Sequence, residues 1–296
     1  MKSHIAVFAL AVSFALPVVL QAQPSAHYVP GSEGIDCATL PPPGIYVRDY
    51  NLAYYSTRLN NSSGDNANVP NFRAFTYANV PRVIWITDVK FLGGYLGVDG
   101  LVPLIYNDLR VPGYNQGTFG VGDVFGEGTL SWHIKQFDFA LGSGVWMPEG
   151  DSPTSAGPST RAGLGYWTFM QTAGSTWYVD DAKTWAVSLL NRYEFNTEQA
   201  DTHITPGQAW TAEWGISKKF AKIVDVGPVG YYQQQVTTDS GPKVSSDRNR
   251  VAAVGPEVNV VIPKLMLFIS ARYEYEFLAD SRAQGETATI TLTKRF

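Results

Sequence analysis

The first candidate for chemistry is a serine flanked by glycine, aspartate and proline, Gly150-Asp151-Ser152-Pro153. These are the residue types of a hydrolase nucleophile block, and a serine nucleophile needs a histidine as its general base. His133 and His203 lie elsewhere in the chain, but no spacing ties either of them to Ser152. We interpret the block as a turn, where these residue types are common, and predict no catalytic residues and no enzyme activity.

Signatures of metal, nucleotide and nucleic-acid binding are also missing from the sequence. The chain has no His-x-His, Cys-x-x-Cys or calcium-type Asp-rich loop. The glycines at 120, 122 and 126 do not have the spacing of a dinucleotide fingerprint, and glycines there ease strand curvature or a bulge. With a formal net charge of -4 and scattered basic residues, we expect no cofactor, no metal and no nucleic-acid partner.

A set of ionisable residues is the better candidate for function. These residues recur at alternate positions within segments that also hold apolar residues, so β-strands would project them into one enclosed space. Two interpretations stay open: the residues pair and plug the interior for stability, or they line a solute path and set its selectivity. The set is Asp123, Glu127, His133, Arg192, Glu194, Glu213, Glu257, Arg272, Glu274 and Glu276.

The elements that must position these residues are β-strands, because segments of alternating polarity recur along the chain. The last residues show the pattern most clearly, with threonines at 287, 289, 291 and 293 opposing Ala288, Ile290 and Leu292. We predict twelve strands, over residues 45–55, 75–88, 94–106, 119–134, 137–147, 162–176, 183–195, 208–218, 224–237, 249–262, 265–278 and 286–296.

The connections between these strands alternate in length and chemistry. Long polar connections are predicted at 60–66, 108–117, 148–161, 196–207, 239–247 and 279–285. Tight turns are predicted at 91–93, 135–136, 180–182, 220–222 and 263–264. Long loops at one end and short turns at the other are typical of an up-and-down barrel that crosses an outer membrane.

Composition decides whether the apolar faces of the strands point inward or outward. Charged residues are 16% of the chain and aromatic residues 13%, whereas an ordinary soluble domain has about 25% charged residues. Twelve strands also enclose more space than the roughly eight whose side chains just fill the interior. We therefore predict an antiparallel transmembrane β-barrel with a polar lumen, and prefer it to a secreted soluble β-protein.

The start of the chain indicates export. Lys2 and His4 precede an apolar run over residues 5–20, which ends at a tolerable cleavage site after Ala22. We predict a signal peptide over 1–22, a periplasmic segment over 23–44 and a barrel over 45–296. The one cysteine, Cys37, has no disulfide partner and is interpreted as a free structural thiol.

The sequence also resembles the proteobacterial outer-membrane proteins named for the MetA pathway of phenol degradation. The resemblance covers nearly all of the chain after residue 22. Its motifs, in order, are Ala38-Thr39-Leu40-Pro41-Pro42-Pro43-Gly44-Ile45-Tyr46, Gly120-Val121-Gly122-Asp123, Met147-Pro148-Glu149-Gly150, Thr205-Pro206-Gly207, Gly227-Pro228-Val229-Gly230-Tyr231 with Gln235, Thr238 and Asp239, Val254-Gly255-Pro256-Glu257, and terminal Phe296.

This resemblance implies a barrel in the Gram-negative outer membrane that helps small aromatic or hydrophobic compounds, such as phenols, to cross. It implies outer-membrane lipid and such a solute as partners, and it carries no catalytic residues. The end of the chain, Phe296, is similar to the signal that the barrel-assembly machinery reads. Lys294 stands where an apolar or aromatic residue is more usual.

Two other functions remain as alternatives to a conduit. One is a closed structural or adhesive barrel whose surface loops bind a partner. The other is a barrel enzyme such as a lipid hydrolase, which would need a serine and a histidine paired on the lipid face.

Overall fold

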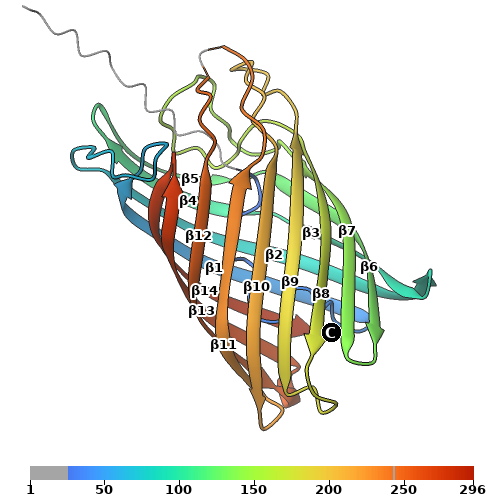
Figure 1. Cartoon of the computed structure of the whole chain (residues 1–296). Helices are drawn as coiled ribbons and strands as arrows, with labels where there is room; N and C mark the ends of the chain where they lie inside the picture. Colours follow the sequence, from blue (N-terminus) through green and yellow to red (C-terminus); the bar gives the residue numbers. More distant parts are fainter. Residues whose placement is uncertain (1–25, 243) are drawn as a thin grey trace, which may run out of the picture.

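The fold is a single antiparallel β-sheet that closes on itself (Figure 1). The computed structural model describes residues 26–242 and 244–296, so the expected signal peptide at 1–22 lies outside the described residues. Closure is made by β1, which pairs with β14 on one side and with β2 on the other, so that Leu52 faces both Thr289 and Ala78. No helix in the described part of the chain is long and apolar enough to span a bilayer.

The strands are β1 Gly44–Leu59, β2 Arg73–Phe91, β3 Gly94–Leu101, β4 Leu104–Val111, β5 Tyr114–Val121, β6 Val124–Ile134, β7 Phe137–Met147, β8 Thr168–Tyr178, β9 Trp185–Asn196, β10 Ala209–Phe220, β11 Val224–Gln235, β12 Arg250–Ile262, β13 Leu267–Asp280 and β14 Ala283–Arg295, with a 3-10 turn η1 at Pro263–Leu265.

These strands make twelve crossings, as the sequence predicted, because two pairs of strands are halves of one crossing. Both β3 and β4 pair with β2, on either side of Pro81. The break between them falls at residues 102–103, where Pro103 has no N–H to give to the ladder. A matching break at residues 122–123 separates β5 from β6, and the N–H of Gly122 donates to the carbonyl of Pro103 at 2.8 Å.

Long and short connections lie at opposite ends of the barrel, with the long loops at the top of Figure 1. Two of the predicted long loops were wrong, however. Residues 108–117 and 279–285 are mostly strand, and their turns are only Pro112-Gly113 and Ser281-Arg282. The polar residues of these hairpins indicated loops. The hairpins extend beyond the apolar band of the barrel, where paired strands need no alternation of apolar residues, and Asp108 is paired there with Gly117.

The barrel is apolar outside and polar inside, which is the reverse of a water-soluble barrel. Outward side chains such as Trp85, Phe169 and Ile290 are about half exposed, at 52%, 52% and 53%. Inward Glu194 and Glu213 are 1% and 2% exposed. The orientation predicted from the closing strand is therefore confirmed.

The chain end completes the closure of the barrel. Tyr46 of β1 faces Arg295 of β14, and the N–H of Phe296 donates to the carbonyl of Ile45 at 2.9 Å. The Lys294 ammonium donates to the carbonyl of Leu265 in the neighbouring turn. The role of Phe296 as an assembly signal stays a prediction.

A closed, fully hydrogen-bonded barrel of this kind should resist detergent until it is heated. We expect the folded protein to migrate faster than the boiled chain on a detergent gel, because the barrel stays compact. An identical migration before and after boiling, in a protein that dissolves in plain buffer, would contradict the membrane barrel.

Candidate functional site

The chain before β1 lies inside the barrel, where it fills much of the lumen. We call residues 26–43 the N-terminal plug. Its residues Tyr28, Ile35 and Ala38 are 7%, 5% and 2% exposed. His27 bonds to Thr168 near the long loops, and Thr39 bonds to Tyr178 at the other end of β8, at 2.8 and 3.3 Å. The plug thus runs the length of the lumen, whereas a periplasmic location was expected for residues 23–44.

Carboxylates of the wall hold the plug by its main chain. Oε1 of Glu194 accepts the N–H groups of His27 and Tyr28, both at 3.0 Å. Glu213 accepts three more, from residues 31, 32 and 33, at 2.9, 3.2 and 3.0 Å, and also the Tyr28 hydroxyl. Glu257 accepts the N–H of Ile35 at 2.9 Å. Buried main-chain N–H groups must be paired, so these carboxylates anchor the plug.

Two glycines let the plug approach these carboxylates closely. Gly31 and Gly34 have φ angles of +81° and +68°, a region that costs other residues energy. A Cβ on Gly34 would collide with Oε2 of Glu257 and Nη1 of Arg272, the ends of two side chains of the wall. A larger residue at position 34 therefore strains the backbone of the plug and forces the Glu257 carboxylate, one of its anchors, to move.

Among the described residues, Glu33 is the plug residue whose carboxylate forms ion pairs with the wall, and three arginines surround it. Its oxygens lie 2.7 Å from Arg48, 3.0 Å from Arg82 and 3.5 Å from Arg192. The hydroxyl of Tyr50 donates to it at 3.1 Å. The three guanidinium groups thus compensate the charge of the buried Glu33 carboxylate.

A second anchor of the plug is Asp123, at the break between β5 and β6. It is 3% exposed and accepts from Nε2 of His27 at 2.8 Å. It also accepts the N–H groups of Gly150 and Leu164, at 3.0 and 2.7 Å. One carboxylate therefore ties the plug to both limbs of the loop over residues 148–167.

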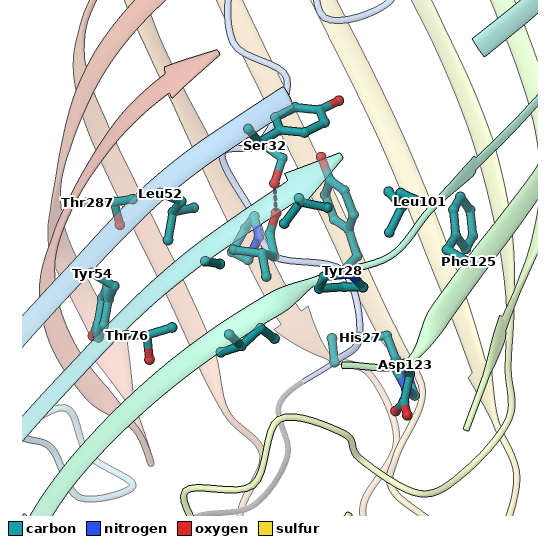
Figure 2. Close-up of a pocket in the computed structure, with 18 of the residues that line it drawn as sticks. His27, Tyr28, Ser32, Leu52, Tyr54, Thr76, Leu101, Asp123, Phe125 and Thr287 are labelled. Carbon is teal, nitrogen blue, oxygen red and sulfur yellow. Dashed lines mark hydrogen bonds and ion pairs between the residues drawn. The ribbon is translucent and has the colours of Figure 1, made fainter. Parts of the chain in front are cut away.

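Beside the plug lies a cavity of about 320 Å³, which we call the chamber. Figure 2 shows its wall, with Leu52, Leu101 and Phe125 facing the space and His27 and Asp123 at its lower edge in the view. Its apolar lining comes mainly from β1, β2 and the plug, with single residues from several other strands, and its charged rim includes Glu33, Arg82 and Arg192. The rest of the apolar lining includes Val80, Ile105, Trp146, Leu164 and Met170.

The structure brings nine of the ten predicted ionisable residues together inside the barrel, all of them buried. Those nine are Asp123, Glu127, Arg192, Glu194, Glu213, Glu257, Arg272, Glu274 and Glu276. Arg272 pairs with Glu257 and Glu274, at 3.1 and 3.3 Å. His133 lies apart, at the end of β6 near a short turn, where it bonds to Asp138 at 2.9 Å.

Sequence reasoning missed Arg48, Arg82 and the plug itself. Arg48 shares its face of β1 with Tyr46, Tyr50 and Leu52, so the sequence did not indicate a polar, lumen-facing side of this strand. Arg82 likewise shares its face of β2 with inward Ile84, which is 5% exposed. Arg48 and Arg82 each lie at an inward position in the alternation of their strand, and from this position they could have been predicted to face the lumen.

A serine hydrolase would need a histidine bonded to Ser152, and the histidines of the described chain bond to other residues. Ser152 lies in the loop over residues 148–167, and His203 forms its bond with Glu198 at 2.8 Å. His133 is bonded to Asp138, and His27 to Asp123 and Thr168. Each of these histidines in the described chain is thus engaged elsewhere.

A closed barrel of twelve crossings, with an apolar exterior and charged interior, defines a β-barrel of the Gram-negative outer membrane. The chain belongs to the family described as the putative MetA-pathway of phenol degradation, whose model matches residues 57–292. The family resemblance read from the sequence is thereby confirmed. No curated protein matches the sequence.

One solved structure supports the same fold, and two others match less well. An outer membrane channel from Pseudomonas putida F1 superposes with a TM-score of 0.78 at 12% identity, covering 91% of this chain and 100% of that chain. The β domain of a Bordetella autotransporter gives a TM-score of 0.49 at 14% identity, over 86% of this chain and 99% of its own. A porin in complex with oligogalacturonate gives 0.46 at 10% identity, over 84% and 99%.

Replacing Gly34 by alanine should release the plug. A left-handed φ costs an L-residue roughly 1–2 kcal/mol, and the added Cβ also collides with Glu257. We expect open-channel events in planar bilayers to become about tenfold more frequent. Gly113→Ala is the matched control, because its φ is +80° in the β4–β5 turn with nothing within 4 Å. Equal conductance of G34A and G113A would show that the plug does not close the lumen.

Replacing Asp123 by asparagine should loosen the loop over residues 148–167. Loss of the charge weakens three buried hydrogen bonds and should cost about 1–3 kcal/mol locally. Limited trypsin cleavage after Arg161, which is exposed in this loop, should therefore be faster in D123N than in the wild type. Asp180→Asn, at the opposite end of the barrel, serves as the control. Unchanged cleavage in D123N would exclude Asp123 as the anchor.

Proposed function

We propose that this protein is an outer-membrane conduit for small aromatic or hydrophobic compounds, such as phenols. The observation that carries the proposal is the chamber, an apolar space in the middle of a lumen that is otherwise charged. Its volume of about 320 Å³ exceeds the roughly 150 Å³ of an engineered apolar cavity that binds benzene. A single aromatic ring with a small substituent therefore fits in it.

The chamber also has polar side chains within its apolar lining. Thr76 and Thr287 are among the lining residues. A threonine hydroxyl both donates and accepts hydrogen bonds, which suits a phenolic oxygen. A mostly apolar pocket with few, placed polar groups is typical of small-molecule sites.

A route from the outside is supported by a second, smaller cavity of about 140 Å³. It lies between the loops over residues 148–167 and 197–208, and Leu164 lines both this cavity and the chamber. Leu164 is also the residue whose N–H is held by Asp123. In the proposed conduit the solute enters this smaller cavity and passes Leu164 to reach the chamber. The plug then blocks passage from the chamber to the other end of the barrel.

Filling the chamber should block transport. Ala78 is buried and lines the chamber, so Ala78→Trp should reduce uptake of radiolabelled phenol by cells at limiting concentration to near the empty-vector rate. Tyr77→Trp is the matched control, because Tyr77 is the neighbouring residue and is 41% exposed on the outer face. Uptake that is equal in A78W and Y77W, with both barrels folded, would count against passage through the chamber.

A closed barrel whose loops bind a partner remains the second candidate, favoured by the plug that fills the lumen. It predicts no conductance in planar bilayers and no phenol uptake for the wild type. It also predicts surface binding that is lost when residues 148–161 are trimmed. Phenol uptake above the empty-vector rate in cells that make the wild type would decide for the conduit.

A further inference from the structure

Three arginines of the barrel wall, two of them buried and one partly exposed, converge on a carboxylate that the wall does not supply. Arg48 of β1, Arg82 of β2 and Arg192 of β9 all contact Glu33 of the plug. Arg82 and Arg192 are each 6% exposed. Uncompensated buried charge is expensive, so the occupant of this site is part of its electrostatic balance.

The plug supplies the direct ion-pair partner of two of these arginines. Asp99 and Glu127 of the wall lie 2.9 and 3.5 Å from Arg82. Among the described residues, Arg48 and Arg192 form an ion pair with Glu33 only, and Glu127 and Glu213 act on Arg192 from farther away. Without a carboxylate in the place of Glu33, Arg48 and Arg192 would therefore have no direct ion-pair partner.

Free donors at the same place also point to a ligand. The Nε atoms of Arg48 and Arg192 are buried and have no hydrogen-bond partner among the described residues. Guanidinium groups present their donors in a planar fork that matches a carboxylate. Glu33 therefore uses only part of the donor set that the arginines offer.

The apolar chamber begins at this arginine group. Arg82, Arg192 and Glu33 line it together with Leu101 and Phe125. A molecule whose carboxylate replaces that of Glu33 would therefore have its apolar body in the chamber.

We propose that Arg48, Arg82 and Arg192 form a binding site for the carboxylate of a small aromatic or hydrophobic acid, which Glu33 occupies as a built-in substitute ligand. The proposal deepens the proposed function, because it names a solute class for the same chamber. Displacement of Glu33 by such an acid removes one of the plug's anchors, so the solute competes with the segment that closes the lumen.

The test measures binding in detergent by isothermal titration calorimetry, with benzoate as the probe and benzyl alcohol as its neutral counterpart. Glu33→Ala vacates the site, and Glu33→Gln removes the charge while keeping the side-chain volume. We expect benzoate to bind both variants at least about tenfold more tightly than the wild type. Benzyl alcohol should bind all three alike. Heat-modifiable migration verifies that each barrel is folded.

The arginines are tested in the vacated background. Benzoate binding should fall about tenfold or more in E33A/R192Q, whereas E33A/R110Q should retain it because Arg110 is an exposed residue of β4. Benzoate binding no tighter than benzyl alcohol in both Glu33 variants would overturn the proposal, as would full retention in E33A/R192Q.

These outcomes separate the two proposals. If benzoate fails to bind but A78W still blocks phenol uptake, the conduit stands and the carboxylate site falls. If benzoate binds but phenol uptake is insensitive to A78W, the site stands and the phenol route falls.

Discussion

The architecture of the lumen depends on hydrogen bonds from the main-chain N–H groups of the plug to buried glutamates. Strand amides find partners in the sheet, but the amides of residues 26–43 have no neighbouring strand, and buried amides must be paired. Glu194 and Glu213 have the complementary need, because a buried carboxylate is stable only when donors surround it. Each group satisfies the other, which is why an irregular segment can lie inside the barrel.

The plug is held by two kinds of contact. Carboxylates of β9, β10 and β12 receive its N–H groups, whereas arginines of β1, β2 and β9 receive the Glu33 side chain. The apolar chamber borders the second kind, because Arg82, Arg192 and Glu33 line it. The space beside the plug therefore adjoins a group that can hold the negative end of an apolar molecule.

The barrel could be predicted from the sequence because the bilayer imposes a strict rule. Every crossing strand must present apolar side chains to lipid, as Ile290 and Leu292 do, so a period of two persists along the chain. The rule lapses beyond the bilayer, and there the hairpins around Pro112-Gly113 and Ser281-Arg282 were mistaken for loops.

Inside the lumen no such rule holds. Nine of the predicted ionisable residues lie there, but their partners depend on long-range pairing. Glu213 meets Gly31 across 182 residues of sequence, and no local pattern in residues 26–43 reveals that contact. Arg48 and Arg82 were hidden for a related reason, since the apolar chamber gives their strands inward faces that are partly hydrophobic.

The plug is continuous with β1, so its release is an equilibrium between a bound and a displaced state of a segment that stays attached to the barrel. Gly44 is paired in the sheet opposite Ile86, so a displaced plug stays attached to the rim of the lumen it has left. A short flexible tether holds its end group at an effective concentration of about millimolar. Reclosure is therefore unimolecular and independent of how many copies the membrane holds. A soluble carboxylate displaces Glu33 only when it is concentrated enough, or binds tightly enough, to compete with that local concentration of Glu33. The protein would therefore respond to a plentiful solute and not to traces of it.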